Sequence, residues 1–276
     1  METNRSDTAS SSVETLRTWI EECPPHGMVF FGGAGVSTES GIPDFRSASG
    51  IFLQDLGQQA AEFAERTGHP QRAKKLANLK LSPEQVVSRT FFDEYPAEFY
   101  AFYCDKMIFT EAQPNAAHRK LAQLEEQGTL RAIVTQNIDG LHQAAGSRNV
   151  FELHGSVMRN FCMRCRAPYS LDEMLTARKA SEDGIPRCPA CGGIIKPDVV
   201  LYEEGLDMDV LEGAVDAIAH ASLLVIAGTS LVVNPAASLI HYFRGEHLAI
   251  VNLSPTSADR HADLVVAEPV GKVFDF

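Results

Sequence analysis

Several features that would place this chain in a broad class are missing from its 276 residues. No run of about 18 apolar residues occurs, so we predict no transmembrane helix and no membrane partner. Residues 1–12 are polar, without the apolar core of a secretory signal, which predicts a flexible tail and a cytoplasmic protein. No Lys/Arg-rich run offsets the formal net charge of −12, which argues against nucleic-acid binding and favours basic partners such as lysine-rich segments.

The hydrophobic content of 45% and the charged content of 22% are typical of a globular protein. Six short apolar runs rich in β-branched residues have the pattern of buried strands, and helical patterns lie between several of them. Ser11 and Glu14 have the spacing of a capping box, which predicts a helix starting there. The alternation predicts an α/β fold, with a six-stranded, mostly parallel, Rossmann-like sheet and helices on both faces. The predicted strands are Met28–Phe31, Arg131–Thr135, Val150–Leu153, Leu223–Ala227, Ala249–Leu253 and Leu264–Val266, and the main predicted helices are Pro114–Gln127, Leu206–Ala219 and Pro235–Phe243.

Four of the six cysteines form two C-x-x-C pairs, Cys162 with Cys165 and Cys188 with Cys191, separated by 22 residues. Two such pairs bring four thiolates to one tetrahedral Zn²⁺, and a site closed by four cysteines is structural because no position stays open for water. A redox motif would need only one pair beside a βαβ unit, and three disulfides would suit a secreted chain. The spacing therefore predicts a zinc ribbon.

A glycine-rich loop, 32–38, follows the first predicted strand. Glycines at this point let the backbone approach a pyrophosphate, and a following helix would offer unpaired N–H groups. The usual dinucleotide fingerprint has a third glycine where this chain has Thr38. On its own the loop is compatible with a nucleotide site or with a tight turn that holds no ligand.

Two further polar segments follow strands. Residues 136–142 come after the second strand and His154 comes after the third, and ligands of open α/β sheets bind at the carboxyl ends of strands. Asn137 and Asp139 could instead cap a helix, and a lone histidine is often structural. An imidazole that titrates near neutral pH is nevertheless suited to removing a proton from a sugar hydroxyl.

The stretches GAGVSTESGIPDFRS (33–47), TQNIDGLH (135–142) and ELHGS (152–156) resemble the signatures of the sirtuin family, as does the cysteine module. The similarity is to bacterial-type, short-tailed members and covers nearly the whole chain. It implies an NAD-dependent protein-lysine deacylase that transfers the acyl group to ADP-ribose and releases nicotinamide. It also implies that His154 is the general base and that Asn137 assists it. The NAD contacts that it implies are Ala34, Gly35, Thr38, Phe45, Arg46, Gln136, Ile138, Asp139, Gly228, Thr229, Ser230, Asn252 and Lys272.

The resemblance also divides the chain. It implies a tail (1–12), an NAD-binding domain (13–48, 113–155 and 196–276), and a small domain with a helical module (49–112) and a zinc ribbon (156–195). The family usually continues past the position of Phe276 through a terminal helix, so we expect a short C-terminal end.

The segment 196–204 resembles the part of sirtuins that pairs with the substrate backbone, which implies an acyl-lysine protein or peptide as partner. The contacts implied are Val199, Val200, Leu201, Tyr202 and Val233. Glu203 stands where sirtuins often have glycine, and its charge predicts a preference for Lys or Arg near the acyl-lysine.

Sirtuins that remove acidic acyl groups carry a Tyr-x-x-Arg pair, and the corresponding Tyr100 and Tyr103 here include no arginine. An acidic acyl group would be buried without a partner, which favours acetyl or longer neutral acyl groups. Three other functions stay open on the sequence alone: ADP-ribosyl transfer to protein, hydride transfer, and non-catalytic NAD binding.

Overall fold

The fold was analysed in a computed structural model of the chain, which describes residues 3–44, 61–62, 64–65, 71, 74 and 81–276. The chain forms two compact units. The first contains Met1–Asp44, Glu111–Leu153 and Leu206–Phe276, and the second contains Phe45–Thr110 and His154–Gly205. No helix among the described residues is long and apolar enough to cross a bilayer.

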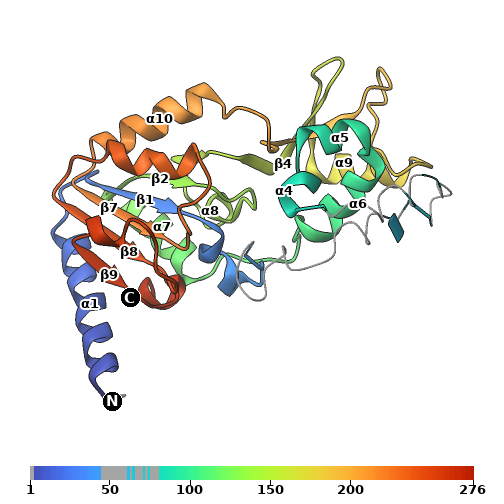
Figure 1. The fold of residues 1–276 in the computed structure, drawn as a ribbon. Helices are drawn as coiled ribbons and strands as arrows, with labels where there is room; N and C mark the ends of the chain where they lie inside the picture. Colours follow the sequence, from blue (N-terminus) through green and yellow to red (C-terminus); the bar gives the residue numbers. More distant parts are fainter. Residues whose placement is uncertain (1–2, 45–60, 63, 66–70, 72–73, 75–80) are drawn as a thin grey trace. The chain divides into compact units, whose positions relative to one another are not determined.

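The first unit is built on a six-stranded sheet in the order β3-β2-β1-β7-β8-β9, with every neighbouring pair parallel (Figure 1). The strands are β1 (Met28–Gly32), β2 (Leu130–Thr135), β3 (Val150–Glu152), β7 (Leu223–Ala227), β8 (His247–Val251) and β9 (Leu264–Val266). The predicted α/β fold with helices around a parallel sheet is thus confirmed. The order reverses between β1 and β7, and such a switch point is where open α/β sheets bind ligands.

Alternate residues of the central strands feed two separate cores, because successive side chains of a strand point to opposite faces. Phe30 and its neighbours pack with α1 (Thr3–Glu22), α7 (Ala116–Glu126) and α11 (Val270–Val273). Phe31 and its neighbours pack with α10 (Met208–Ala219) and the 3₁₀ helix η4 (Ala236–Tyr242). The remaining elements of this unit are η1 (Ala34–Val36), η2 (Thr38–Ser40), α8 (Leu141–Ala144) and η5 (Asp259–His261).

Several elements differ from the sequence prediction in their bounds or their type. Helix α1 begins at Thr3, so residues 3–12 are helical where a tail was predicted, and Ser11 lies inside the helix and caps nothing. The residues 236–242 form a 3₁₀ helix rather than an α-helix. Strand β8 ends at Val251, because Asn252 turns the chain through a hydrogen bond from its Nδ2 to Ser254 O (2.7 Å).

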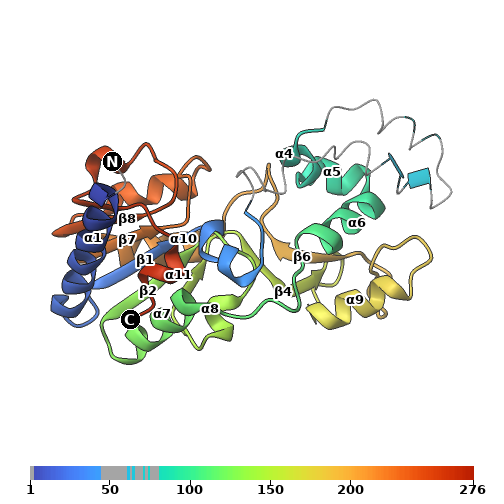
Figure 2. The same ribbon diagram turned by 90° about the horizontal axis from the view of Figure 1, so that it is seen from below.

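The second unit contains a three-stranded antiparallel sheet in the order β5-β4-β6, flanked by α9 (Figure 2). Its described elements are α4 (Pro83–Val86), α5 (Arg89–Glu94), α6 (Pro96–Lys106), β4 (Gly155–Cys162), β5 (Pro168–Ser170), α9 (Leu171–Lys179) and β6 (Ile195–Val199). Residues 196–205, which the sequence groups with the NAD-binding part, lie in this unit because β6 pairs with β4. Only glycine fits at position 155, where a Cβ atom would lie 1.9 Å from Asp198 O.

Candidate active site

The loops that follow β1 and β7 touch through their backbones. Gly35 N donates to Gly228 O (2.8 Å), and a Cβ atom on Gly35 would lie 2.7 Å from Gly228 Cα. Gly228 itself has a φ of 59°, in the left-handed region that favours glycine. The close contact between the two loops is therefore sufficient to explain why both positions are glycine, whether or not a ligand binds there.

The segment after Gly33 is not the α-helix expected from the dinucleotide fingerprint. It forms two short 3₁₀ turns, η1 and η2, in which Val36 N bonds Gly33 O and Ser37 N bonds Ala34 O, both at 3.0 Å. These two N–H groups therefore have partners and are not offered to a phosphate by a helix start. Ala34 lies in η1, and Thr38 opens η2 with an exposed side chain.

Ser37 joins the first loop to the second. Its side chain is buried, its hydroxyl donates to Asp139 Oδ2 (2.7 Å) and it accepts from Asn137 Nδ2 (3.1 Å). Asp139 Oδ1 also accepts from Leu141 N (2.9 Å) at the start of α8. Ser37 is not among the predicted site residues, because only the tertiary structure brings it within reach of residues about 100 positions away.

Other predicted NAD residues also lie in these loops. Gln136 Oε1 accepts from Thr229 Oγ1 (3.1 Å), while Ser230 beside it is exposed. Lys272 is exposed and its ammonium pairs with Glu268 (2.9 Å). The half-buried residues are Ile138, Asn252 and, from the predicted peptide contacts, Val233. Phe45 and Arg46 lie outside the described residues.

Two buried histidines stand beside this site. The rings of His118 and His142 are 4.8 Å apart, and neither ring nitrogen of His142 has a hydrogen-bond partner among the described residues. Burial lowers the pKa of His118 to about 4, against the opposing effect of Asp139, and lowers the pKa of His142 well below its usual value. Both are held neutral, so neither is suited to act as a base near neutral pH.

His154 lies in the connection between β3 and β4, half-buried. Its carbonyl accepts from Val200 N (3.0 Å), which anchors the backbone at this position within the second unit. Leu153, the residue before it, donates to Thr135 O (2.9 Å) at the end of β2.

The four cysteines of the second unit form the predicted cluster. The Sγ atoms all lie within 4.8 Å of one another, with 3.4 Å between Cys162 and Cys191 and 3.7 Å between Cys165 and Cys188. Tetrahedral zinc with Zn–S bonds of about 2.3 Å requires sulfurs about 3.8 Å apart, so this donor set fits the metal. Tyr169 Oη donates to Cys188 Sγ (3.0 Å) and lowers the pKa of that thiol, which favours the thiolate that a metal binds.

The predicted peptide segment, Val199–Tyr202, continues from β6. The backbone of Tyr202 is already paired on both sides, because its N–H donates to Val87 O (3.0 Å) and its carbonyl accepts from Arg89 N (2.9 Å). Its side chain is exposed, as is that of Glu203. Glu203 has a φ of 77°, a left-handed conformation that costs a non-glycine residue roughly 1 kcal/mol.

Tyr100 and Tyr103 on α6 are completely buried. The Tyr100 hydroxyl donates to Ile195 O (2.5 Å), which ties α6 to β6, whereas the Tyr103 hydroxyl has no hydrogen-bond partner among the described residues. Burial raises the pKa of both phenols, so both stay neutral.

Comparison with known proteins agrees with this geometry. The Sir2 family model matches residues 33–77 and 62–235, and the chain belongs to this family. It is 54% identical over 249 residues to an NAD-dependent protein deacetylase of Clostridium perfringens, covering 90% of this chain and 91% of that protein. An NAD-dependent protein deacetylase of Cutibacterium acnes is 47% identical over 259 residues, covering 94% of each chain.

Solved structures give the same result. A Sir2 variant with a deacetylated p53 peptide and 3'-O-acetyl ADP-ribose matches with a TM-score of 0.78 at 35% identity, over 95% of this chain and 96% of that one. A Sir2 complex with a p53 peptide and NAD+ matches with a TM-score of 0.75 at 34% identity, over 95% of each chain. The predicted family is therefore confirmed.

Proposed function

We propose that this chain is an NAD-dependent protein-lysine deacylase that transfers the acyl group to ADP-ribose and releases nicotinamide. The observation that carries the proposal is the convergence of the first and second loops on Ser37, which holds Asn137 and Asp139 by two hydrogen bonds. The names of the relatives support it, since both bacterial proteins are NAD-dependent protein deacetylases.

NAD supplies the reactive bond, which joins nicotinamide to ribose. In the proposal the loops after β1, β2 and β7 bind NAD, and Asn137 orients a polar group beside the ribose. His154 accepts the proton of a ribose hydroxyl, a task that suits an imidazole near neutral pH. The four cysteines hold zinc in a closed site, so the metal supports the fold and does not activate water.

The substrate in this proposal is an acyl-lysine protein or peptide that pairs with the segment Val199–Tyr202 and with Val233. Acetyl and neutral acyl groups are favoured, because the buried Tyr100 and Tyr103 offer no cation to an acidic acyl group. The predicted segments 13–48 and 113–155 of the NAD-binding domain and the cytoplasmic location stay predictions of the sequence.

Replacement of the proposed base tests the function. We expect His154→Ala to lower NAD-dependent deacetylation by about 10²–10⁴-fold, the usual contribution of a general base. The assay measures nicotinamide release and peptide mass with acetyl-, longer-acyl- and succinyl-lysine peptides. The exposed His220→Ala serves as the matched control.

The fold of the variant is checked by zinc content and NAD binding, both of which should persist. Near-normal turnover in His154→Ala would refute the assignment of the base. A peptide that gains the mass of ADP-ribose, rather than losing an acyl group, would identify the protein as a transferase of ADP-ribose.

A further inference from the structure

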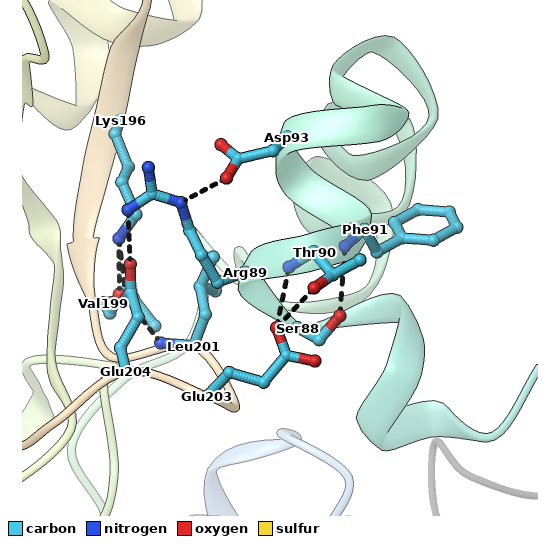
Figure 3. Close-up of polar contacts among 10 residues, drawn as sticks. All are labelled: Ser88, Arg89, Thr90, Phe91, Asp93, Lys196, Val199, Leu201, Glu203 and Glu204. Atoms are coloured by element: carbon cyan, nitrogen blue, oxygen red, sulfur yellow. Dashed lines mark hydrogen bonds and ion pairs between the residues drawn. The ribbon is translucent and has the colours of Figure 1, made fainter.

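Two adjacent carboxylates, Glu203 and Glu204, connect the turn after β6 to helix α5 (Figure 3). These two side chains join the turn to α5 across more than 110 positions of the chain. We name the set of Arg89, Thr90, Lys196, Glu203 and Glu204 the carboxylate clasp.

Glu203 binds the first turn of α5. Its Oε2 accepts from Thr90 N (2.9 Å) and from Thr90 Oγ1 (2.8 Å). Ser88 caps the next N–H of the same turn, that of Phe91 (3.1 Å), so Glu203 satisfies a donor that the helix itself leaves open. Hydrogen bonds to an ionised acceptor are stronger than neutral ones, and this pair offsets the left-handed backbone of Glu203.

Glu204 closes the turn from the other side. Its Oε2 accepts from Leu201 N (2.9 Å) and from Lys196 Nζ (3.1 Å), and its Oε1 accepts from Arg89 Nη1 (3.2 Å). Lys196 is buried, and its ammonium also donates to the carbonyl of Val199 (3.0 Å). The segment from Val199 to Glu204 is therefore fixed by both carboxylates and by the backbone pairs of Tyr202.

We propose that Glu203 is a positioning residue for the acyl-lysine peptide, acting through Thr90 to hold the turn in its peptide-binding shape. This inference rests on the proposed function, because that function makes Val199–Tyr202 the peptide segment. The carboxylate of Glu203 accepts two hydrogen bonds from Thr90, so in this inference it acts through the shape of the turn, and the predicted preference of its charge for Lys or Arg in the peptide is the competing explanation.

The kinetics of the full-length enzyme with an acetyl-lysine peptide test this. Glu203→Ala removes both hydrogen bonds and keeps the left-handed position, and we expect KM for the peptide to rise about tenfold. Because NAD binds in the other unit, kcat and the KM for NAD should stay within about twofold. Glu203→Gln keeps an acceptor oxygen and should restore most of the peptide affinity.

The partner of Glu203 offers a matched pair of variants. Thr90→Val loses the hydroxyl and keeps the backbone N–H, so the peptide KM should rise about threefold, whereas Thr90→Ser should behave as the parent. Since both residues form one interaction, Glu203→Ala combined with Thr90→Val should be no worse than Glu203→Ala alone. The exposed Glu182→Ala controls for loss of negative charge in the same unit.

The outcomes separate the two proposals. An unchanged peptide KM in Glu203→Ala, with an active parent enzyme, overturns the clasp and leaves the proposed function intact. A Glu203→Gln variant that loses discrimination between basic and acidic peptides also overturns it, in favour of a charge effect. A parent enzyme inactive on every acyl-lysine peptide overturns the proposed function and this inference with it.

Discussion

The two units hold their candidate functional segments by different kinds of interaction. In the first unit, mostly neutral groups fix the loops: the Ser37 hydroxyl accepts from the Asn137 amide and Gly35 N donates to Gly228 O, while the carboxylates of Asp139 and Glu39 accept from Ser37 and from Gly271 N. In the second unit, Arg89, Lys196 and the two clasp carboxylates fix the turn, and four thiols gather at one point.

The difference follows from what surrounds each segment. Burying a charge is costly unless it is paired, so contacts between loops at the ends of buried parallel strands are made mainly by backbone, hydroxyl and amide groups. The second unit has a three-stranded sheet against six strands in the first, and small units commonly depend on metals or charged contacts for stability. Perturbations of metal, pH and single hydroxyls should therefore affect the two units unequally.

Removal of zinc should have the largest effect. A chelator, or Cys188→Ser, should unfold the zinc ribbon because the metal-binding free energy of such a site is folding free energy. Deacetylation should be lost completely, while NAD binding by the first unit persists. Metal analysis, circular dichroism and NAD titration measure the three quantities, and full activity in a zinc-free protein would contradict the structural role.

Acid should destabilise the first unit through His118 and His142. The folded-state pKa of His118, about 4, lies below the value of about 6.5 expected when unfolded, so unfolding takes up a proton between these values. The stability contributed by the neutral form is complete above pH 6.5 and is lost as the pH falls, by about 3 kcal/mol at pH 4.

Denaturant unfolding at a series of pH values measures this loss. His142→Phe removes the fully buried ring that lacks hydrogen-bond partners among the described residues, and it should flatten the pH profile in this range. His220→Gln, at an exposed site, should leave the profile unchanged. If the free energy of unfolding fell equally with pH in the parent and in both variants, groups other than His142 would be responsible for the acid sensitivity.

Ser37→Ala should have the smallest effect on stability and a selective effect on NAD use. It leaves the Asp139 carboxylate and the Asn137 amide each without one partner, which costs about 1–3 kcal/mol. We expect the KM for NAD to rise and the peptide KM to stay constant, as measured by initial rates. Ser11→Ala, at an exposed position on α1, is the control. If Ser37→Ala raised only the KM for the peptide, the assignment of this loop contact to NAD binding would be contradicted.

The parts of the fold that were predictable are those set by local pattern. Strands β7 and β9 match their predicted bounds because short continuous apolar runs are typical of strands, although Val265 in β9 is exposed. The prediction that helix α1 begins at Ser11 was wrong, because the spacing of a capping box is a short signal that also occurs inside helices. The 3₁₀ form of η4 depends on contacts that periodicity does not report.

The sequence by itself was sufficient to predict the family, the parallel sheet and the four-cysteine cluster, because each prediction depends on local sequence, either a contiguous motif or the spacing of residues along the chain. The tertiary structure decided which side chains support those motifs. Ser37 and Asn137 are 100 residues apart and Thr90 and Glu203 are 113 apart, and a hydrogen bond between such residues depends on how the chain folds and not on their spacing.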